Sequence, residues 1–202
     1  IEETAWPNRI LVGLISISGS VLLGGVLIST ISNIIERRVG VVYTGRMTYR
    51  NIKNHYVLIG FNELSINMIR ELYDECPSAR ILLMSGIEAA TVRHRIQSAL
   101  PIEIERQVLV YFGNIESIEE LQRLNIESAI EVYVLGVEER YGRDAKNIAI
   151  VHLVSALRGK CSDGKMMPVY VQFDSIPSYS NIQKMNLPPE VFCIEGKPNI
   201  FF

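Results

Sequence analysis

Residues 55–202 alternate between short apolar runs and longer amphipathic runs. Uninterrupted short apolar runs are typical of parallel strands that are buried on both faces. The runs predict strands at Tyr56–Gly60, Arg80–Met84, Gln107–Phe112, Glu131–Leu135, Pro168–Phe173 and Val191–Ile194. The segments between them predict helices at Leu64–Asp74, Ala89–Ala99, Ser117–Leu124, Asp144–Leu157 and Tyr179–Met185. This alternation predicts an α/β fold with a doubly wound parallel sheet, Rossmann-like and six-stranded.

The segment Ile10–Ile35 departs from this pattern because it is apolar and carries no charged residue. About 20 apolar residues span a bilayer core, so the segment predicts a transmembrane helix over residues 10–36. A signal peptide is a poorer explanation, because the run is too long and no small-residue cleavage site follows it. A buried helix of a soluble core is also a poorer explanation, because such a helix rarely extends this far without a charge.

Charged residues flank the apolar segment unequally. Glu2, Glu3 and Arg9 precede it. The basic residues that follow it are Arg37, Arg38, Arg46, Arg50 and Lys53. An excess of Lys and Arg marks the cytoplasmic side, so we expect a membrane protein whose residues after about 36 are cytoplasmic. The expected divisions are an extracytoplasmic lead-in at 1–9, the transmembrane helix at 10–36, a linker at 37–54 and the Rossmann-like unit at 55–202. The linker either continues the helix or leaves the membrane as an extended strand.

Small and hydroxyl side chains recur along the apolar segment. Ser20 and Gly24 are four residues apart, as are Gly25 and Ser29. Such rows let membrane helices approach closely, and their hydroxyl groups could also line an aqueous path. Each mid-helix Gly lowers helix propensity by about 1 kcal/mol relative to Ala, so Gly24-Gly25 is a candidate bend. Ser20, Gly24, Gly25 and Ser29 are therefore candidate pore or hinge residues, although a single-pass anchor would tolerate the same residues.

The turn after the first predicted strand is the candidate nucleotide site. A dinucleotide fingerprint reads G-x-G-x-x-G, and its second Gly lets backbone N–H groups reach the pyrophosphate. The three positions here are Gly60, Asn62 and Ser65, so only the first Gly is present. Asn62 places a side chain where the pyrophosphate would approach, whereas Ser65 is small enough for close packing of helix on strand.

The end of the second predicted strand also departs from the fingerprint. An acid should follow Met84 to hold the ribose hydroxyls, but the chain has Ser85-Gly86. We therefore expect no NAD(H) at Gly60, Asn62, Ser65 and Ser85, and we interpret the turn as a structural one. An unconventional anion at the helix N-terminus is the alternative, since free N–H groups attract anions there.

Charge, cysteine and histidine content limit the classes of function that remain possible. The formal net charge is −2, which gives no indication of nucleic-acid binding. The three Cys residues form no C-x-x-C pair, so a disulfide or zinc framework is not expected. His55, His94 and His152 lack metal-ligand spacing, and we assign them structural roles. Glu116, Glu119 and Glu120 are interpreted as a solvated helix face.

Three carboxylates follow the fourth predicted strand, near where open sheets bind ligands. Glu138, Glu139 and Asp144 could hold Ca²⁺ through oxygen ligands. The alternatives are exposure to solvent or pairing with Arg140 and Arg143. No nucleophile and base can be paired in the sequence, so we expect no enzymatic activity.

Several of these features together resemble the regulator-of-K⁺-conductance (RCK, or TrkA-N) family. The resemblance rests on the apolar helix, the basic linker, the six-stranded unit and the segment from Gly113-Asn114-Ile115-Glu116 to Val132-Tyr133-Val134-Leu135. Gly60-Phe61-Asn62 and Asp144-Ala145 are most similar to CASTOR- and POLLUX-type channels and their bacterial relatives. Asn114 departs from the family pattern, which commonly has Asp at that position.

The resemblance implies a function in ion transport. In that family four inner helices line a cation pore, and the cytoplasmic units form a gating ring that senses a ligand. It implies that Ile10–Ile35 is an inner pore helix and that the chain is a piece of a longer homotetrameric K⁺ or Ca²⁺ channel. The implied partners are the lipid bilayer, a permeating cation and an unidentified gating ligand. Two alternatives stay open, namely a membrane-anchored sensor or transporter subunit without a pore and an NAD-dependent oxidoreductase.

Overall fold

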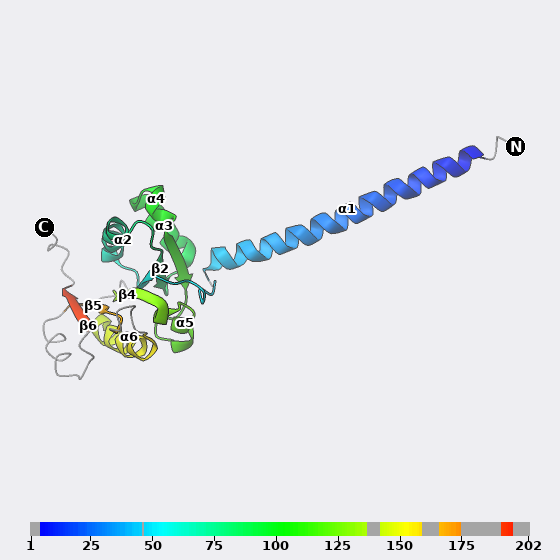
Figure 1. Cartoon of the computed structure of the whole chain (residues 1–202). Coiled ribbons are helices and arrows are strands. Elements are labelled where there is room, and N and C mark those ends of the chain that lie inside the picture. Colours follow the sequence, from blue (N-terminus) through cyan, green and yellow to red (C-terminus); the bar gives the residue numbers. More distant parts are fainter. Residues whose placement is uncertain (1–4, 46, 137–141, 159–165, 175–190, 196–202) are drawn as a thin grey trace. The chain divides into compact units, whose positions relative to one another are not determined.

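The structure is a computed structural model that describes residues 5–45, 47–136, 142–158, 166–174 and 191–195. It divides into two compact units, Ile1–Val42 and Tyr43–Phe202, which are described separately (Figure 1). The second unit holds all six strands.

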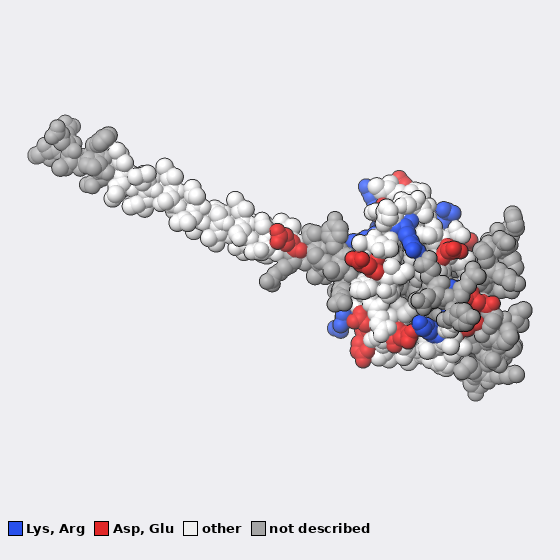
Figure 2. Space-filling view, turned by 180° about the vertical axis from the view of Figure 1, so that it is seen from behind, with Lys and Arg blue, Asp and Glu red and all other residues white. Residues whose placement is uncertain are grey.

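The first unit consists of helix α1, which extends from Ala5 to Thr44 across the boundary between the units. Its segment Ile10–Glu36 has a mean hydropathy of 2.3 and is long and apolar enough to cross a membrane. None of its most apolar window is buried within the chain, which distinguishes α1 from a helix in a soluble core. Figure 2 shows this surface free of charged side chains except near the end of the segment. The helix continues through Gly24 and Gly25 without a break.

The second unit is built on one parallel sheet with the strand order β3-β2-β1-β4-β5-β6. The strands are β1 (His55–Ile59), β2 (Ile81–Ser85), β3 (Val108–Phe112), β4 (Ala129–Val134), β5 (Val169–Phe173) and β6 (Val191–Glu195). The chain moves outward from β1 to β3 and then crosses to β4 on the other side of β1. This reversal creates the crevice at which doubly wound folds usually bind ligands. The predicted fold class is confirmed.

Helices cover both faces of the sheet (Figure 1). They are α2 (Glu63–Glu75), α3 (Ala89–Ala99), α4 (Ile102–Glu105), α5 (Ile118–Gln122), the 3-10 helix η1 (Ile126–Ser128) and α6 (Arg143–Leu157). Sequence reasoning did not predict α4 and η1, because single turns of helix are too short to show an apolar period. The helix predicted at Tyr179–Met185 lies outside the described residues.

Alternate residues of each strand enter two separate cores. Val57 and Ile59 of β1 pack in one core with residues of α5 and α6. Tyr56 and Leu58 pack in the other with residues of α2 and α3. All four side chains are almost completely buried, which explains why this strand reads as an uninterrupted apolar run.

The segment Gly45–Asn54, which we call the strap, joins α1 to β1 in the sequence. Its hydrogen bonds lead from the end of β3, past the end of α5, to the residue before β4. The Gly45 carbonyl accepts a hydrogen bond from the Phe112 N–H of edge strand β3, at 2.7 Å. Tyr49 N–H donates to the Arg123 carbonyl (2.9 Å), and Asn54 N–H donates to the Ser128 carbonyl (3.0 Å). The Asn125 side-chain amide donates to the Ile52 carbonyl at 2.6 Å. Side-chain and backbone contacts therefore attach the strap at Gly45, Tyr49, Ile52 and Asn54.

Beside the end of the strap, His55 is completely buried. Its Nε2 lies 3.0 Å from the Leu124 carbonyl, while its Nδ1 has no hydrogen-bond partner. The pKa of His55 is lowered chiefly because burial penalises the charged imidazolium, and the bond to Leu124 opposes this only in part.

A histidine with a lowered folded-state pKa makes stability depend on pH. In the unfolded chain the histidine binds a proton near pH 6.5, whereas in the folded protein it binds one only at a lower pH. We therefore expect the free energy of unfolding to keep its maximal value above about pH 7 and to decrease as the pH drops through 6.5. Melting temperatures between pH 5 and 8 should fall less steeply on acidification in His55→Gln than in the unsubstituted protein. His94→Gln, on the exposed face of α3, is the control, and an equal loss of slope there would contradict the assignment.

Candidate functional site

The turn between β1 and α2 depends on Gly60. Its φ of +97° is strained for a residue with a side chain, and its N–H donates to the Met84 carbonyl at 2.8 Å. A Cβ atom on Gly60 would lie 2.1 Å from the carbonyl oxygen of Gly136, which follows β4. The first Gly of the fingerprint is therefore needed so that two loops can pass each other at the carboxyl edge of the sheet.

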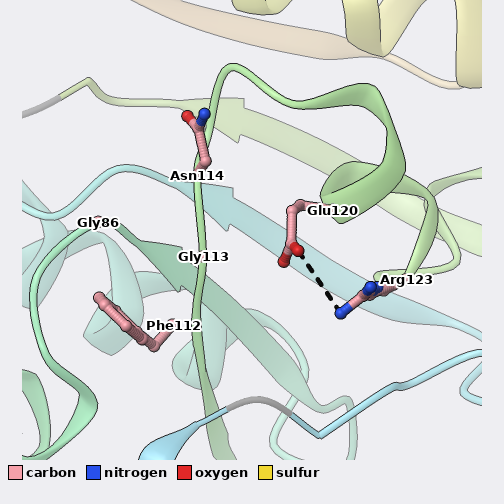
Figure 3. A pocket seen from close by; sticks show the side chains of 6 residues that line it. All are labelled: Gly86, Phe112, Gly113, Asn114, Glu120 and Arg123. Carbon is pink, nitrogen blue, oxygen red and sulfur yellow. Dashed lines mark ion pairs between the residues drawn. The ribbon is translucent and has the colours of Figure 1, made fainter.

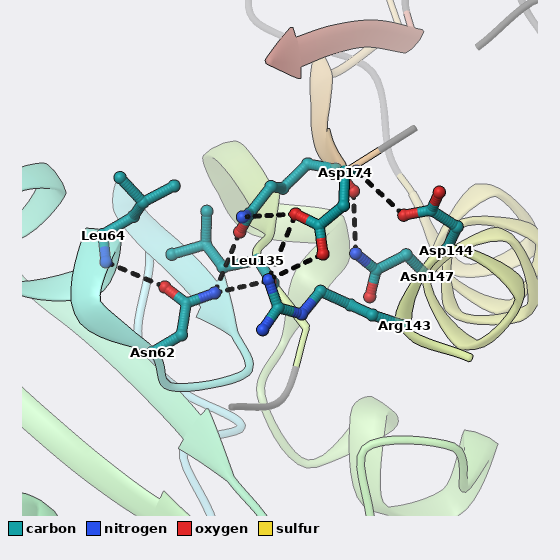
Figure 4. Close-up of polar contacts among 8 residues, drawn as sticks. Asn62, Leu64, Leu135, Arg143, Asp144, Asn147 and Asp174 are labelled. Atoms are coloured by element: carbon teal, nitrogen blue, oxygen red, sulfur yellow. Dashed lines mark hydrogen bonds and ion pairs between the residues drawn. The ribbon is translucent and has the colours of Figure 1, made fainter. Parts of the chain in front are cut away.

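Asn62 points from this turn towards Leu135, between β1 and the residues around the start of α6 (Figure 4). Its Nδ2 donates to the Leu135 carbonyl (2.8 Å) and to Oε1 of Gln172 (2.9 Å). Its Oδ1 accepts a hydrogen bond from Leu64 N–H (2.9 Å), and its own N–H donates to Ser65 Oγ (2.9 Å). The side chain is 6% exposed. One amide thus caps α2 and joins the turn to β4 and β5.

The hydrogen bonds continue from Gln172 across the start of α6. The Gln172 carbonyl accepts from Asn147 Nδ2 (2.8 Å), and both residues are buried. Arg143, which is 7% exposed, forms an ion pair with Asp174 at 2.9 Å. Asp174 N–H in turn donates to Asp144 Oδ1 at 3.0 Å. Residues that follow β1 and β4, lie in or after the end of β5, or belong to the first turns of α6 therefore form one polar cluster.

This cluster does not suit a dinucleotide. The pyrophosphate of such a cofactor needs the open N-terminus of the first helix, but the Asn62 side chain caps that end of α2. The buried guanidinium of Arg143 is paired with Asp174. The predicted residues Gly60, Asn62 and Ser65 lie together at this turn, whereas Ser85 ends β2 and its Oγ accepts a hydrogen bond from Ile87 N–H (3.0 Å). The residues present do not fit NAD(H) in its usual position.

The predicted Ca²⁺ ligands are only partly described. Glu138 and Glu139 lie outside the described residues, and Asp144 accepts the hydrogen bond from Asp174. Among residues that the structure describes, no group of three His, Cys, Asp or Glu side chains is placed to hold a metal ion.

A separate groove of about 520 Å³ lies at the carboxyl ends of β2 and β3 (Figure 3). It is lined by Gly86, Phe112, Gly113, Asn114, Glu120 and Arg123. Gly113 packs closely at this groove, since a Cβ atom there would lie 2.7 Å from Glu120 Oε2 and 2.7 Å from Tyr111 Cε1. Figure 3 shows the Phe112 ring on one side of the Gly113 backbone and Glu120 with Arg123 on the other.

One side of the groove is a charged pair, and the Tyr111 side chain contacts this pair. The Tyr111 hydroxyl donates a short hydrogen bond to Glu120 Oε2, and Arg123 lies 3.5 Å from Glu120 Oε1. Burial of Tyr111, and then its bond to Glu120, raises the pKa of the phenol, so it stays a proton donor. Sequence reasoning placed Glu120 on a solvated face. The structure shows it partly buried, because its bonds to Tyr111 and Arg123 turn it towards the end of β3.

Comparison with known proteins places this fold. No family model matches the chain, and no curated protein matches it significantly. The NAD-bound GsuK channel superposes with a TM-score of 0.55 and 14% identity over 85% of this chain and 27% of that chain. For ADP-bound GsuK the TM-score is 0.55 with 16% identity over 90% of this chain and 43% of that chain. The GsuK RCK domain gives 0.53 with 14% identity over 79% of this chain and 30% of that chain.

These likenesses establish the architecture of the chain. At 14–16% identity they concern the fold, and the chain spans less than half the length of each of these three structures. The chain has the fold of an RCK domain.

Proposed function

We propose that the chain is a pore helix and cytoplasmic regulatory domain of a ligand-regulated, homotetrameric cation channel that conducts K⁺ or Ca²⁺. The RCK fold supports a regulatory domain of a K⁺ channel or transporter. The length and hydropathy of α1 support insertion in a bilayer, and the basic residues that follow its apolar segment support a cytoplasmic position of the strap and sheet. The nearer likeness to CASTOR- and POLLUX-type channels rests on Gly60-Phe61-Asn62 and Asp144-Ala145. The proposed role is mechanical, with no enzymatic activity.

The observation that carries the proposal is how the chain is attached to the sheet directly after α1 ends. Gly45, the residue after α1, is buried and hydrogen-bonded to β3, and the strap stays attached until β1 begins. A slack linker would absorb a rearrangement of the sheet and its helices. An attached strap passes the force to α1, which is what a gating domain requires. A gating ligand shifts this equilibrium only if it binds one state better than the other.

Reconstitution of the full-length protein in liposomes tests the proposal. We expect a cation current and a tetrameric particle. A monomer in detergent that passes no current under any ligand would overturn the channel function.

Two rivals predict other outcomes. A membrane-anchored sensor or transporter subunit would bind its partner but conduct nothing by itself. An oxidoreductase would bind NAD(H) tightly, and the likeness to NAD-bound and ADP-bound GsuK makes this worth measuring. Calorimetric titration of the full-length protein with NAD(H) should show no tight binding, because Asn62 fills the crevice.

Gly24 and Gly25 provide a test of the hinge. Each Gly→Ala substitution favours the straight helix by about 1 kcal/mol, and added methyl groups meet no atom of the chain within 4 Å. We expect the double substitution to reduce ligand-dependent opening in single-channel recordings. Gly13→Ala with Gly19→Ala is the matched control on the same helix, and an equal effect there would exclude a specific hinge.

A further inference from the structure

Three aromatic rings form a stack across β4, β5 and β6. Tyr133, Tyr170 and Phe192 lie directly opposite one another in these strands. The ring centroids of Tyr133 and Tyr170 are 4.8 Å apart, and those of Tyr170 and Phe192 are 5.3 Å apart. Tyr133 is 7% exposed and belongs to the core that contains residues of α2 and α3, whereas Phe192 is 47% exposed. The stack therefore leads from this core to an open surface at β6, the edge strand of the sheet (Figure 1).

The exposed end of the stack is one of few apolar positions on the surface of the second unit. Outside α1, the exposed residues among the described large apolar side chains are Met47, Ile102 and Phe192. Helix α6 packs against the opposite face of β5, in the core that contains Val169 and Val171. Aromatic residues that are exposed in one chain are enriched at the centres of protein interfaces. The Phe192 ring is therefore a candidate contact for a partner.

Two carboxylates lie near the phenol groups on this side of the sheet. Glu131, two residues before Tyr133 on the same face of β4, accepts a short hydrogen bond from the Tyr133 hydroxyl. Glu75 is the last residue of α2 and is exposed. Burial is the main reason why the pKa values of Tyr56, Tyr133 and Tyr170 are raised, and the charges of both carboxylates raise all three further. Glu75 and Glu131 therefore act on the same three phenols.

No described cation neutralises these two carboxylates. Neither Glu75 nor Glu131 forms an ion pair with a described Lys or Arg. No described cation lowers the pKa of the three phenols, whereas Arg93 opposes the rise that burial causes for Tyr49. A metal ion is disfavoured, because within the described residues no group of three His, Cys, Asp or Glu side chains is placed to hold one. Negative charge beside aromatic surface favours an organic cation instead.

An arginine side chain matches this surface better than a lysine. The guanidinium is planar, and its five N–H donors can bond two carboxylates and a phenol oxygen at once. It also packs against aromatic rings at a smaller cost in lost hydration than an ammonium group. The exposed ring of Phe192 provides an apolar contact for a residue beside that arginine, which a free small cation would not use. A polypeptide that carries arginine and an apolar residue therefore fits both parts of the surface.

We propose that the surface formed by Glu75, Glu131, Tyr170 and Phe192 is a docking site for an arginine-bearing segment of a partner polypeptide. The two carboxylates bind the guanidinium, and Phe192 packs against a neighbouring apolar side chain of the segment. Docking at this surface does not depend on the channel function, and it adds a protein partner to the regulatory domain.

A fluorescently labelled peptide tests this docking site on the full-length protein. In the extended sequence Ser-Arg-Ser-Leu-Ser-Arg-Ser, both arginines and the leucine point to one side. We expect fluorescence anisotropy to show saturable binding that is about ten-fold tighter than that of the same peptide with lysine in place of arginine. Both peptides carry the same charge, so equal binding of the two would overturn the arginine assignment.

Substitution of the two carboxylates gives a second measurement. Glu75→Gln and Glu131→Gln should each weaken the arginine peptide about ten-fold, because each removes a charge-assisted hydrogen bond. Glutamine keeps an oxygen that can accept the Tyr133 hydroxyl, and an unchanged melting temperature would show that the variants remain folded. Glu63→Gln, at the opposite, exposed end of α2, is the matched control. An equal loss of affinity there would reduce the effect to long-range charge and overturn the docking site.

Substitution of the exposed ring tests the apolar contact. Phe192→Ala should weaken the arginine peptide about five-fold, because the leucine loses the surface against which it packs. Ile102→Ala, which removes another exposed apolar side chain from the second unit, is the control and should leave the affinity unchanged. If Phe192→Ala binds the peptide as tightly as the unsubstituted protein, the ring is not part of a docking site.

Other occupants of the surface would give different results. If agmatine, a free guanidinium compound, binds as tightly as the arginine peptide, the surface is a small-molecule site and the partner polypeptide is excluded. If an oligomer of the full-length protein dissociates in Glu131→Gln and in Phe192→Ala, the occupant is a second copy of this chain, which also overturns the proposal. A protein that conducts cations but does not bind the arginine peptide would overturn the docking site alone, whereas peptide binding without current would overturn only the channel function.

Discussion

Gly60→Ala should abolish stable folding of the sheet. The new methyl group would lie 2.1 Å from the Gly136 carbonyl oxygen and 2.6 Å from the Gly136 carbon and nitrogen. The substitution would also hold an alanine at a φ of +97°, which costs about 1–3 kcal/mol before any clash is counted. Because backbone atoms cannot rotate away as a side-chain end can, the loop after β4 must move. We expect a total loss of about 4 kcal/mol or more.

A loss of this size is large for a protein of ordinary stability. In thermal melts of the full-length protein, the transition should fall by about 10 °C or more or disappear. Gly86→Ala is the matched control, because a Cβ atom there would meet only the Gly113 carbonyl oxygen at 4.0 Å. A melting temperature for Gly60→Ala within 2–4 °C of the control, or about 1 kcal/mol, would mean that the two loops do not pass as closely as described.

Asn62→Ala should have the second largest effect. It removes the cap on α2, worth about 1 kcal/mol, and leaves the Leu135 carbonyl and Gln172 Oε1 without their donor. Buried acceptors that lose a partner cost about 1–3 kcal/mol. We therefore expect a destabilisation of about 2–4 kcal/mol in thermal or denaturant melts.

Asn62→Ser divides this loss into two parts. Serine retains a capping oxygen but is too short to reach Gln172, so only the cap contribution should return. Asn114→Ala is the control, because Asn114 Oδ1 accepts the Glu116 N–H at an exposed turn and its loss should be much smaller. If Asn62→Ala costs no more than this control, the polar cluster in the crevice does not stabilise the fold.

The sequence was informative wherever burial follows from local pattern. The strand at Ile81–Ser85 is apolar because both of its faces are buried, and it was predicted within one residue. Gly60 is the one fingerprint glycine that the sequence retains, and its φ is +97°. Ser65, predicted to be small for close packing, is completely buried. These residues carry their structural role in their own chemistry and their immediate neighbours.

The candidate sites depended on contacts between distant residues. Asn62 was predicted to obstruct a pyrophosphate, but its partner Gln172 lies 110 positions away and has no sequence signal. Glu120 was interpreted as solvated because the period of a short helix cannot show the Tyr111 hydroxyl that reaches it from β3. The linker at 37–54 was left open between a continued helix and an extended strand. Residues 37–44 continue α1, and from Gly45 onward a few backbone bonds to β3 and Arg123 decide its course.

By itself the sequence determined an apolar helix, a parallel α/β unit and a first turn that lacks two glycines of the fingerprint. Local patterns encode these features, because hydrophobic burial and backbone conformation act residue by residue. Only the tertiary structure decided that the crevice is filled by Asn62 and its partners and that a groove lies instead beside Gly113. It also decided that the strap is held by the walls of that groove. Strand order brings these residues together, and no local pattern records which side chains then meet.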